Sequence, residues 1–88
     1  MFPCSGEINF KVKQAKLIME QVYLHYYENS IHFSAIDGIS LEFEGWRFNL
    51  RDSNTEPLLR LNVESKQNIA LMNDKVEELT KLIKKLDI

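Results

Sequence analysis

Strict alternation of apolar and polar side chains dominates the middle of this chain of 88 residues. Apolar residues occupy every second position in three successive stretches, at 39–43, 46–50 and 59–63. Successive side chains of a β-strand point to opposite faces of its sheet, so each stretch predicts a strand with one buried and one polar face. A sheet with a single apolar face needs a second layer to cover that face.

Two more stretches alternate in the same way and predict further strands at residues 7–12 and 30–37. Their apolar rows are Ile8, Phe10 and Val12 in the first stretch, and Ile31, Phe33 and Ala35 in the second. Asp37-Gly38 predicts a type I′ hairpin turn, because both central residues of that turn need positive φ. Glu44-Gly45 predicts the turn that follows.

Two amphipathic segments predict the covering layer. Between Lys13 and Asn29, and again between Gln67 and Leu86, apolar residues recur at spacings of three and four, as on one face of a helix. The second stripe also suits a coiled coil with another chain, but it lasts only about two heptads, so packing on the sheet is favoured. We therefore predict an α+β fold, a two-layer sandwich in which an antiparallel-rich, four- or five-stranded sheet carries two helices on one face. The polar face would hold His32, Glu42, Arg47, Asn49, Arg60 and Asn62.

Composition and charge limit the domain organisation, the location and the partners that we expect for this chain. Residues 1–6 carry Pro and Gly without periodicity and are predicted to be a linker, which leaves 7–88 as a single domain. The formal net charge of −2 gives no general attraction to nucleic acid or to an anionic membrane. Cys4 is the only cysteine, which fits a reducing compartment, and no apolar run approaches the roughly 20 residues of a membrane span. We expect a cytoplasmic location, without nucleic acid or membrane as a partner.

The polar loop from Arg51 to Arg60, with the sequence RDSNTEPLLR, is the strongest candidate site. It gathers two guanidiniums, two hydroxyls and an amide, and Arg presents a fork of donors that suits phosphate or carboxylate. A tight turn through residues 53–55 can also aim backbone N–H groups at an anion. One interpretation is a phosphate site; the other is an ordinary polar turn with solvated arginines. Pro57 stiffens the exit of the loop in either case.

Signs of catalysis are weak elsewhere. His25 and His32 have no Cys, Asp or His at metal-ligand spacing, and Cys4 has no activating partner nearby in the sequence. Glu42 and Glu44 share a face, as ordinary outward-facing residues of a strand often do. We predict no catalytic and no metal-binding residue in the chain.

The loop from Arg51 to Pro57, followed by Arg60 and Glu64-Ser65, resembles the phosphate-binding loop of the α-D-phosphohexomutases. This superfamily includes phosphomannomutase, phosphoglucomutase and phosphoglucosamine mutase. The segments Ser5–Asn9, Asp37-Gly38 and Trp46–Leu50 are similar to its C-terminal domain, so the likeness covers nearly the whole chain in order. Asn54, where a glycine would suit the phosphoglucosamine branch, is more similar to the phosphomannomutase branch.

The resemblance implies a fold and a set of site residues. The fold would be that of the fourth domain of a four-domain enzyme, which is TATA-binding-protein-like. The residues that grip the phosphate of a hexose phosphate would be Arg51, Ser53, Asn54 and Thr55, with Arg60 as a further candidate whose reach alternation does not fix. Glu56 would either hold an arginine in place or be a plain turn residue.

The resemblance also implies an activity for a larger parent enzyme. That enzyme would interconvert hexose 1-phosphate and hexose 6-phosphate through a bisphosphorylated intermediate, with the domain moving on a hinge near Pro3–Gly6. The family's phosphoserine loop, Mg²⁺-binding aspartates and sugar-selecting loop are missing from the sequence, so we expect Mg²⁺ in another domain and no catalysis by this chain alone. Met1-Phe2-Pro3 is then expected to begin a separate domain or a truncated product. The preferred hexose and the oligomeric state are left open.

The alternative function is a stand-alone adaptor that binds protein or single-stranded RNA. Sheet-based RNA readers expose aromatic side chains on the face that binds the bases. In this chain the strand aromatics fall instead in the apolar rows: Phe10, Phe33, Phe43, Trp46 and Phe48. The sequence therefore favours the phosphate-binding interpretation.

Overall fold

One antiparallel sheet and two helices make up the fold, seen in a computed structural model that describes residues 4–35, 38–53, 56–66 and 68–87. Within these residues the strands are β1 Ile8–Lys11, β2 His32–Ser34, β3 Ile39–Phe43, β4 Trp46–Asp52 and β5 Leu58–Ser65. They lie in the order β1-β5-β4-β3-β2, and every neighbouring pair is antiparallel. The predicted α+β class is confirmed, with five strands in the described part of the sheet.

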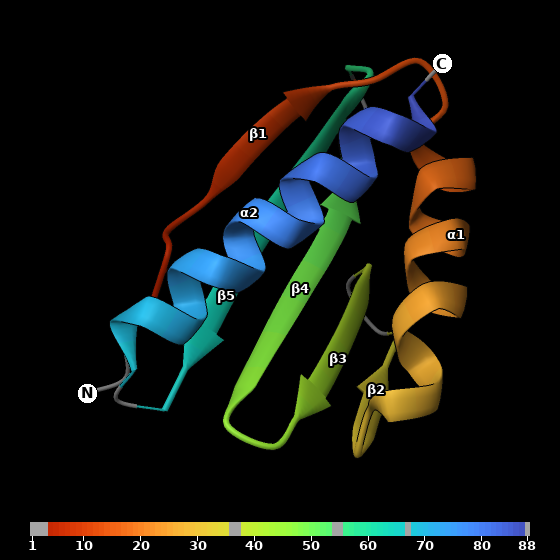
Figure 1. Cartoon of the computed structure of the whole chain (residues 1–88). Coiled ribbons are helices and arrows are strands. Elements are labelled where there is room, and N and C mark those ends of the chain that lie inside the picture. Colours follow the sequence, from red (N-terminus) through yellow and green to blue (C-terminus); the bar gives the residue numbers. More distant parts are fainter. Residues whose placement is uncertain (1–3, 36–37, 54–55, 67, 88) are drawn as a thin grey trace.

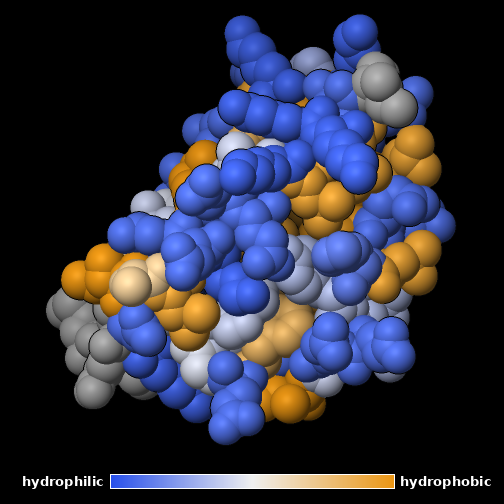
Figure 2. Space-filling view, viewed as in Figure 1, coloured by the Kyte–Doolittle hydropathy of each residue, from blue (hydrophilic) through white to orange (hydrophobic). Residues whose placement is uncertain are grey.

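Both helices lie on one face of the sheet, as Figure 1 shows. They are α1 Ala15–Tyr26, continued by a single 3₁₀ turn, and α2 Ile69–Leu86. Helix α2 buries Leu79 and Ile83 against the sheet, while hydrophilic side chains cover most of its outer surface (Figure 2). The apolar stripe of α2 is therefore used within the domain, as predicted. Its first turn is capped by the Asn68 side chain, which accepts a hydrogen bond from the Leu71 amide at 2.9 Å.

The core lies between the two layers. Strand β5 alternates between buried and half-buried residues along its whole length, and β4 buries Trp46, Phe48 and Leu50 in the same manner. Among the described residues, the other fully buried aliphatic side chains are Ile18, Val22, Leu41, Leu59, Leu61, Val63, Leu79 and Ile83. The single-faced burial predicted from alternation is confirmed for these strands.

Tyr26 joins the two helices at the end of α1. Its ring is buried among Phe43, Trp46 and Phe48, and its hydroxyl donates a hydrogen bond of 2.5 Å to Glu78 Oε1 on α2. Burial raises the pKa of the Tyr26 hydroxyl, and the Glu78 carboxylate raises it further. The same hydrogen bond lowers the pKa of Glu78 against the opposing effect of its own burial.

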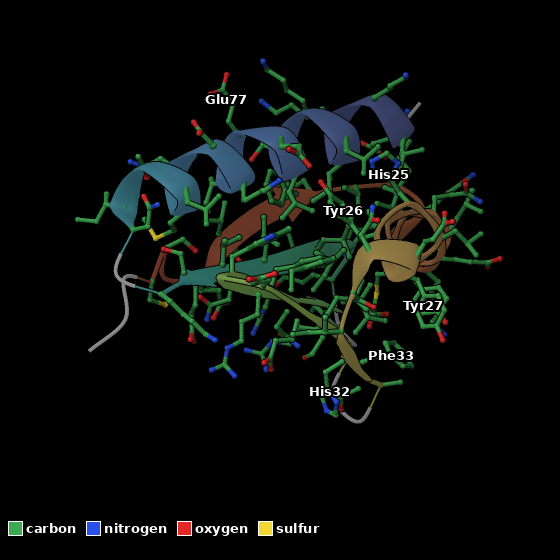
Figure 3. The ribbon with its side chains drawn as sticks, turned by 60° about the horizontal axis from the view of Figure 1, so that its bottom comes forward. His25, Tyr26, Tyr27, His32, Phe33 and Glu77 are labelled. Atoms are coloured by element: carbon green, nitrogen blue, oxygen red, sulfur yellow. The ribbon has the colours of Figure 1, made fainter. Side chains whose placement is uncertain are left out.

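The apolar row predicted around β2 is not buried. Ile31 is 67% exposed, Phe33 is 37% exposed and Ala35 is exposed as well. Strand β2 is the sheet edge beside α1, and Phe33 contacts the rings of Tyr23 and Tyr27 without being enclosed (Figure 3). An apolar side chain at a sheet edge has a neighbouring strand on one side only, so alternation predicted its face correctly and its burial incorrectly.

The hairpin between β2 and β3 is confirmed, but its register differs from that of a two-residue turn. Ser34 pairs with Ser40, whereas a type I′ turn centred on Asp37-Gly38 would pair Ser34 with Leu41. Asp37 lies outside the described residues. Gly38 has a φ of 76°, so the positive φ predicted for the glycine is present.

Part of the predicted linker pairs with the sheet. Cys4 forms an isolated antiparallel bridge with Glu64. The Ser5 amide donates to the Val63 carbonyl at 2.8 Å, and the Ser5 hydroxyl accepts from the Val63 amide at 2.9 Å. Residues 4 and 5 therefore extend the pairing of β1 along β5.

Candidate functional site

Part of the polar loop belongs to the strands, because β4 continues to Asp52 and β5 begins at Leu58, and residues 53–57 connect the two at the end of their hairpin. Asp52 and Leu59 form the last pair of the ladder, and the Ser53 amide donates to the Leu58 carbonyl at 3.1 Å. The carbonyl of Pro57, immediately before β5, accepts a hydrogen bond of 2.9 Å from the Val12 amide. The loop is thus fastened at both ends, while Asn54 and Thr55 lie outside the described residues.

Arg51 and Arg60 are brought together by the register of this hairpin. They are direct partners across β4 and β5, and both belong to the polar face because the buried row holds Leu50, Leu59 and Leu61. Their side chains are 38% and 39% exposed, so water and solutes reach both. Like charges directly opposite one another in a sheet are unfavourable unless an anion lies between them.

Glu7, which sequence reasoning did not select as a site residue, supplies that anion. It lies immediately before β1, and its Oε2 is 3.7 Å from Arg51 Nη2 while its Oε1 is 3.4 Å from Arg60 Nε. Alternation placed Glu7 on the same side as Asn9, the residue that pairs with Arg60. Its closeness to the arginines depends on the pairing of β1 with β5, which no local pattern in the sequence reveals.

A hollow of about 430 Å³ extends from these arginines over the polar face of the sheet. At its other end Arg47 forms an ion pair of 2.9 Å with Glu64. Between the two ends, Asn49 donates from Nδ2 to Ser40 Oγ at 2.9 Å. The hollow therefore combines a cationic end beside the loop with a neutralised end at Arg47.

Except for Glu56, the other residues considered from the sequence lie apart from the loop. His25 packs edge-on against the ring of Tyr26, with ring centroids 4.8 Å apart, and His32 is exposed on the far edge strand β2 (Figure 3). Cys4 donates from Sγ to Asn62 Oδ1 at 3.1 Å. Glu42 faces Arg47 across β3 and β4. Glu56 is exposed, and the carboxylate that contacts both Arg51 and Arg60 is that of Glu7.

Neither a metal cluster nor a membrane span was found in the described part of the chain. No three His, Cys, Asp or Glu side chains gather there as metal ligands. None of the helices in the same residues combines the length and the apolar character needed to cross a bilayer.

One family of domains and several known proteins match this chain. The family of the phosphoglucomutase/phosphomannomutase C-terminal domain matches residues 7–82. A phosphomannomutase of Vibrio cholerae is 99% identical over 88 residues, which cover 100% of this chain and 19% of that protein. A phosphomannomutase of Methanocaldococcus jannaschii is 50% identical over 86 residues, which cover 98% of this chain and 18% of its own. The chain therefore spans less than a fifth of the length of these relatives.

A solved structure has the same fold. The crystal structure of a phosphoglucomutase/phosphomannomutase family protein from Burkholderia thailandensis superimposes with a TM-score of 0.68 at 20% identity. The match covers 100% of this chain and 19% of that one. Together with the family match over 7–82, these findings show that the chain belongs to the phosphoglucomutase/phosphomannomutase family and corresponds to the C-terminal domain of its members.

Proposed function

We propose that this chain is the substrate phosphate-binding domain of a phosphohexomutase of the phosphomannomutase/phosphoglucomutase type. The parent enzyme would interconvert hexose 1-phosphate and hexose 6-phosphate through a bisphosphorylated intermediate. The single observation that carries the proposal is the direct pairing of Arg51 with Arg60 beside the loop that contains Ser53. Two forked guanidiniums on one face form a site suited to the oxygens of a phosphate group.

Each loop residue has a proposed part in this site. Arg51 and Arg60 supply charge-assisted donors from β4 and β5, and Ser53 supplies a hydroxyl from the position that follows β4. Asn54 and Thr55 are proposed to complete the grip, and Glu56 to support an arginine. The net cationic character of this end of the hollow is local, since the whole chain has a formal charge of −2.

The RNA-binding form of the adaptor function is less well supported. The aromatic rings of β3 and β4 stack within the core, where Phe43 and Trp46 lie 4.3 Å apart by ring centroids. Phe33 contacts the helix-side rings of Tyr23 and Tyr27. These rings are therefore unsuited to stacking with bases on the polar face of the sheet.

The rest of the mutase machinery would lie in the other domains of the parent. We propose that they supply the reacting phosphoryl group, Mg²⁺ and the choice of hexose, while this domain holds the phosphate that does not react. A domain that swings closed could keep the intermediate bound while it reorients. Cys4 and Ser5 would move together with the sheet, because they are hydrogen-bonded to β5 or bridged to it.

Titration of the isotope-labelled chain with inorganic phosphate or mannose 6-phosphate, followed by NMR, tests the proposal. We expect amide shifts concentrated at residues 51–60, and an affinity at least about tenfold weaker in Arg51→Ala, the scale of one charge-assisted hydrogen bond. Arg47→Ala is the matched control, since it removes one arginine from the same face at the end already neutralised by Glu64. Shifts confined to the helices, or no shifts at millimolar ligand, would contradict the proposal.

A further inference from the structure

Glu7 contacts both arginines of the proposed phosphate site with one carboxylate. The two contacts come from two different oxygens, at 3.4 Å to Arg60 Nε and 3.7 Å to Arg51 Nη2. Strong ion pairs with hydrogen bonds have N···O distances of about 2.7–2.9 Å. The carboxylate is therefore close enough to offset the repulsion between the guanidiniums, although both contacts are longer than a strong ion pair.

One donor atom of Arg60 lacks a hydrogen bond at this contact. Its Nε is buried and has no partner with hydrogen-bond geometry among the described residues, although Glu7 Oε1 lies 3.4 Å away. A buried donor that lacks a hydrogen bond carries a desolvation cost that a better-placed acceptor would remove. The Arg47–Glu64 pair on the same face is different, because Glu64 Oε2 accepts from Arg47 at 2.9 Å and 3.1 Å.

We propose that Glu7 is an internal counterion of the site, one that holds the two guanidiniums together in the empty domain and competes with the incoming phosphate. This inference rests on the proposed function and adds a residue to it. When phosphate arrives, its oxygens take the donors and the Glu7 carboxylate gives way to water, which reaches it because its side chain is 43% exposed. Glu7 is thus a positioning residue whose charge weakens the grip, which favours release of a phosphate that must leave again.

If Glu7 competes with phosphate through its charge, removing that charge should raise the affinity for phosphate, whereas a purely structural role predicts no such gain. Glu7→Gln keeps the shape of the side chain and removes the competing anion, so phosphate should bind more tightly, by roughly two- to fivefold, the scale of an exposed ion pair. A residue that only supported the arginines would give weaker binding when it was changed. Inorganic phosphate is the probe, with the affinity taken from the amide shift of Ser53 at fixed ionic strength.

Glu64→Gln is the matched control. It removes one negative charge from the same hollow, next to Arg47 and four positions from Arg60 along β5, or about 13 Å. We expect it to change the affinity less than twofold. If Glu64→Gln tightened binding as much as Glu7→Gln, the net charge of the polar face would explain the higher affinity of both variants. That result would overturn the inference.

The wild-type chain gives a second measurement. The side-chain signals of Glu7 should move during the titration with the same apparent Kd as the amide of Ser53, since the carboxylate leaves the arginines as phosphate enters. Weaker or unchanged binding in Glu7→Gln, with wild-type binding intact, would refute the inference and leave the proposed function standing. Absence of phosphate shifts at residues 51–60 in both proteins would refute the proposed function itself.

Discussion

Gly38 lies directly against the backbone of Arg51. A Cβ atom placed on Gly38 would be 2.5 Å from the Leu50 carbonyl oxygen, 2.6 Å from the Arg51 Cβ and 2.8 Å from the Arg51 Cα. Contacts this short force one of the two segments to move, and the atoms concerned are mostly backbone. The turn before β3 therefore helps to fix the position of an arginine of the proposed phosphate site.

Gly38→Ala should lower both the stability of the domain and its affinity for phosphate. A side chain at a φ of 76° costs about 1–2 kcal/mol, and the contact with Arg51 adds to this. Urea unfolding measures the first effect and phosphate titration the second. Gly6→Ala is the control for stability, because Gly6 has a φ of 73° but no atom within 4 Å of the added Cβ. Equal losses of stability in the two variants would show that the contact with Arg51 contributes nothing.

Arg51 and Arg60 should contribute to phosphate binding as a coupled pair. Each single change to alanine is expected to weaken binding by about tenfold or more, since each removes charge-assisted donors. Because the two residues face each other and share Glu7, the double variant should lose less than the product of the single losses. A double-mutant cycle by NMR titration measures the coupling, and strictly independent losses would argue that the arginines bind separate groups.

The hydrogen bond between Tyr26 and Glu78 should stabilise the packing of α1 against α2. Tyr26→Phe removes the donor and keeps the buried ring, so the cost should be about 1 kcal/mol, below the usual value for a charged partner because the Glu78 side chain is 46% exposed. Urea unfolding at neutral pH measures it. Tyr23→Phe on the same helix is the control, and it should unfold like the wild type.

The same pair should give the domain a stability that depends on acidity. The pKa of Glu78 is lower in the folded chain than its ordinary value of 4.5, chiefly because Tyr26 donates to its carboxylate. A lowered folded pKa means that the stabilisation is complete above the unfolded pKa and is lost as the pH falls through the folded one. The difference between wild type and Tyr26→Phe should therefore shrink as urea unfolding is repeated at decreasing pH below 4.5. A difference that stayed constant would exclude this linkage.

The sequence predicted which face of the sheet each site residue occupies, but it did not predict which residues lie next to it in space. Alternation is enough to place Arg51 and Arg60 on the polar face, because Leu50 and Leu59 have to be buried. Their direct pairing depends on the length of the loop between them. The closeness of Glu7 depends on the pairing of β1, the first strand of the chain, with β5, the last. Contacts of that kind follow from topology, which local periodicity does not encode.

Alternation also failed to predict burial at the edge of the sheet. Val63 and Ile31 look equivalent as members of alternating rows, yet Val63 is fully buried in a strand with two neighbours and Ile31 is 67% exposed beside the edge strand β2. Alternation reports which side of a strand is apolar, and burial also requires something to cover it. The helices cover the central strands more completely than β2 (Figure 1).

This difference predicts a large contrast between two similar substitutions. Leu61→Ala should cost about 2–5 kcal/mol, because Leu61 is completely buried in an interior strand of the sheet, where it pairs with Leu50 on one side and Ile8 on the other. Ile31→Ala should change the stability by no more than about 0.5 kcal/mol, since most of its side chain is already in water. Urea unfolding of both variants, with the slope of the transition checked for each, measures the contrast. A cost for Ile31→Ala close to that for Leu61→Ala would mean that another surface buries Ile31 in solution, as self-association would do, and the effect would then depend on protein concentration.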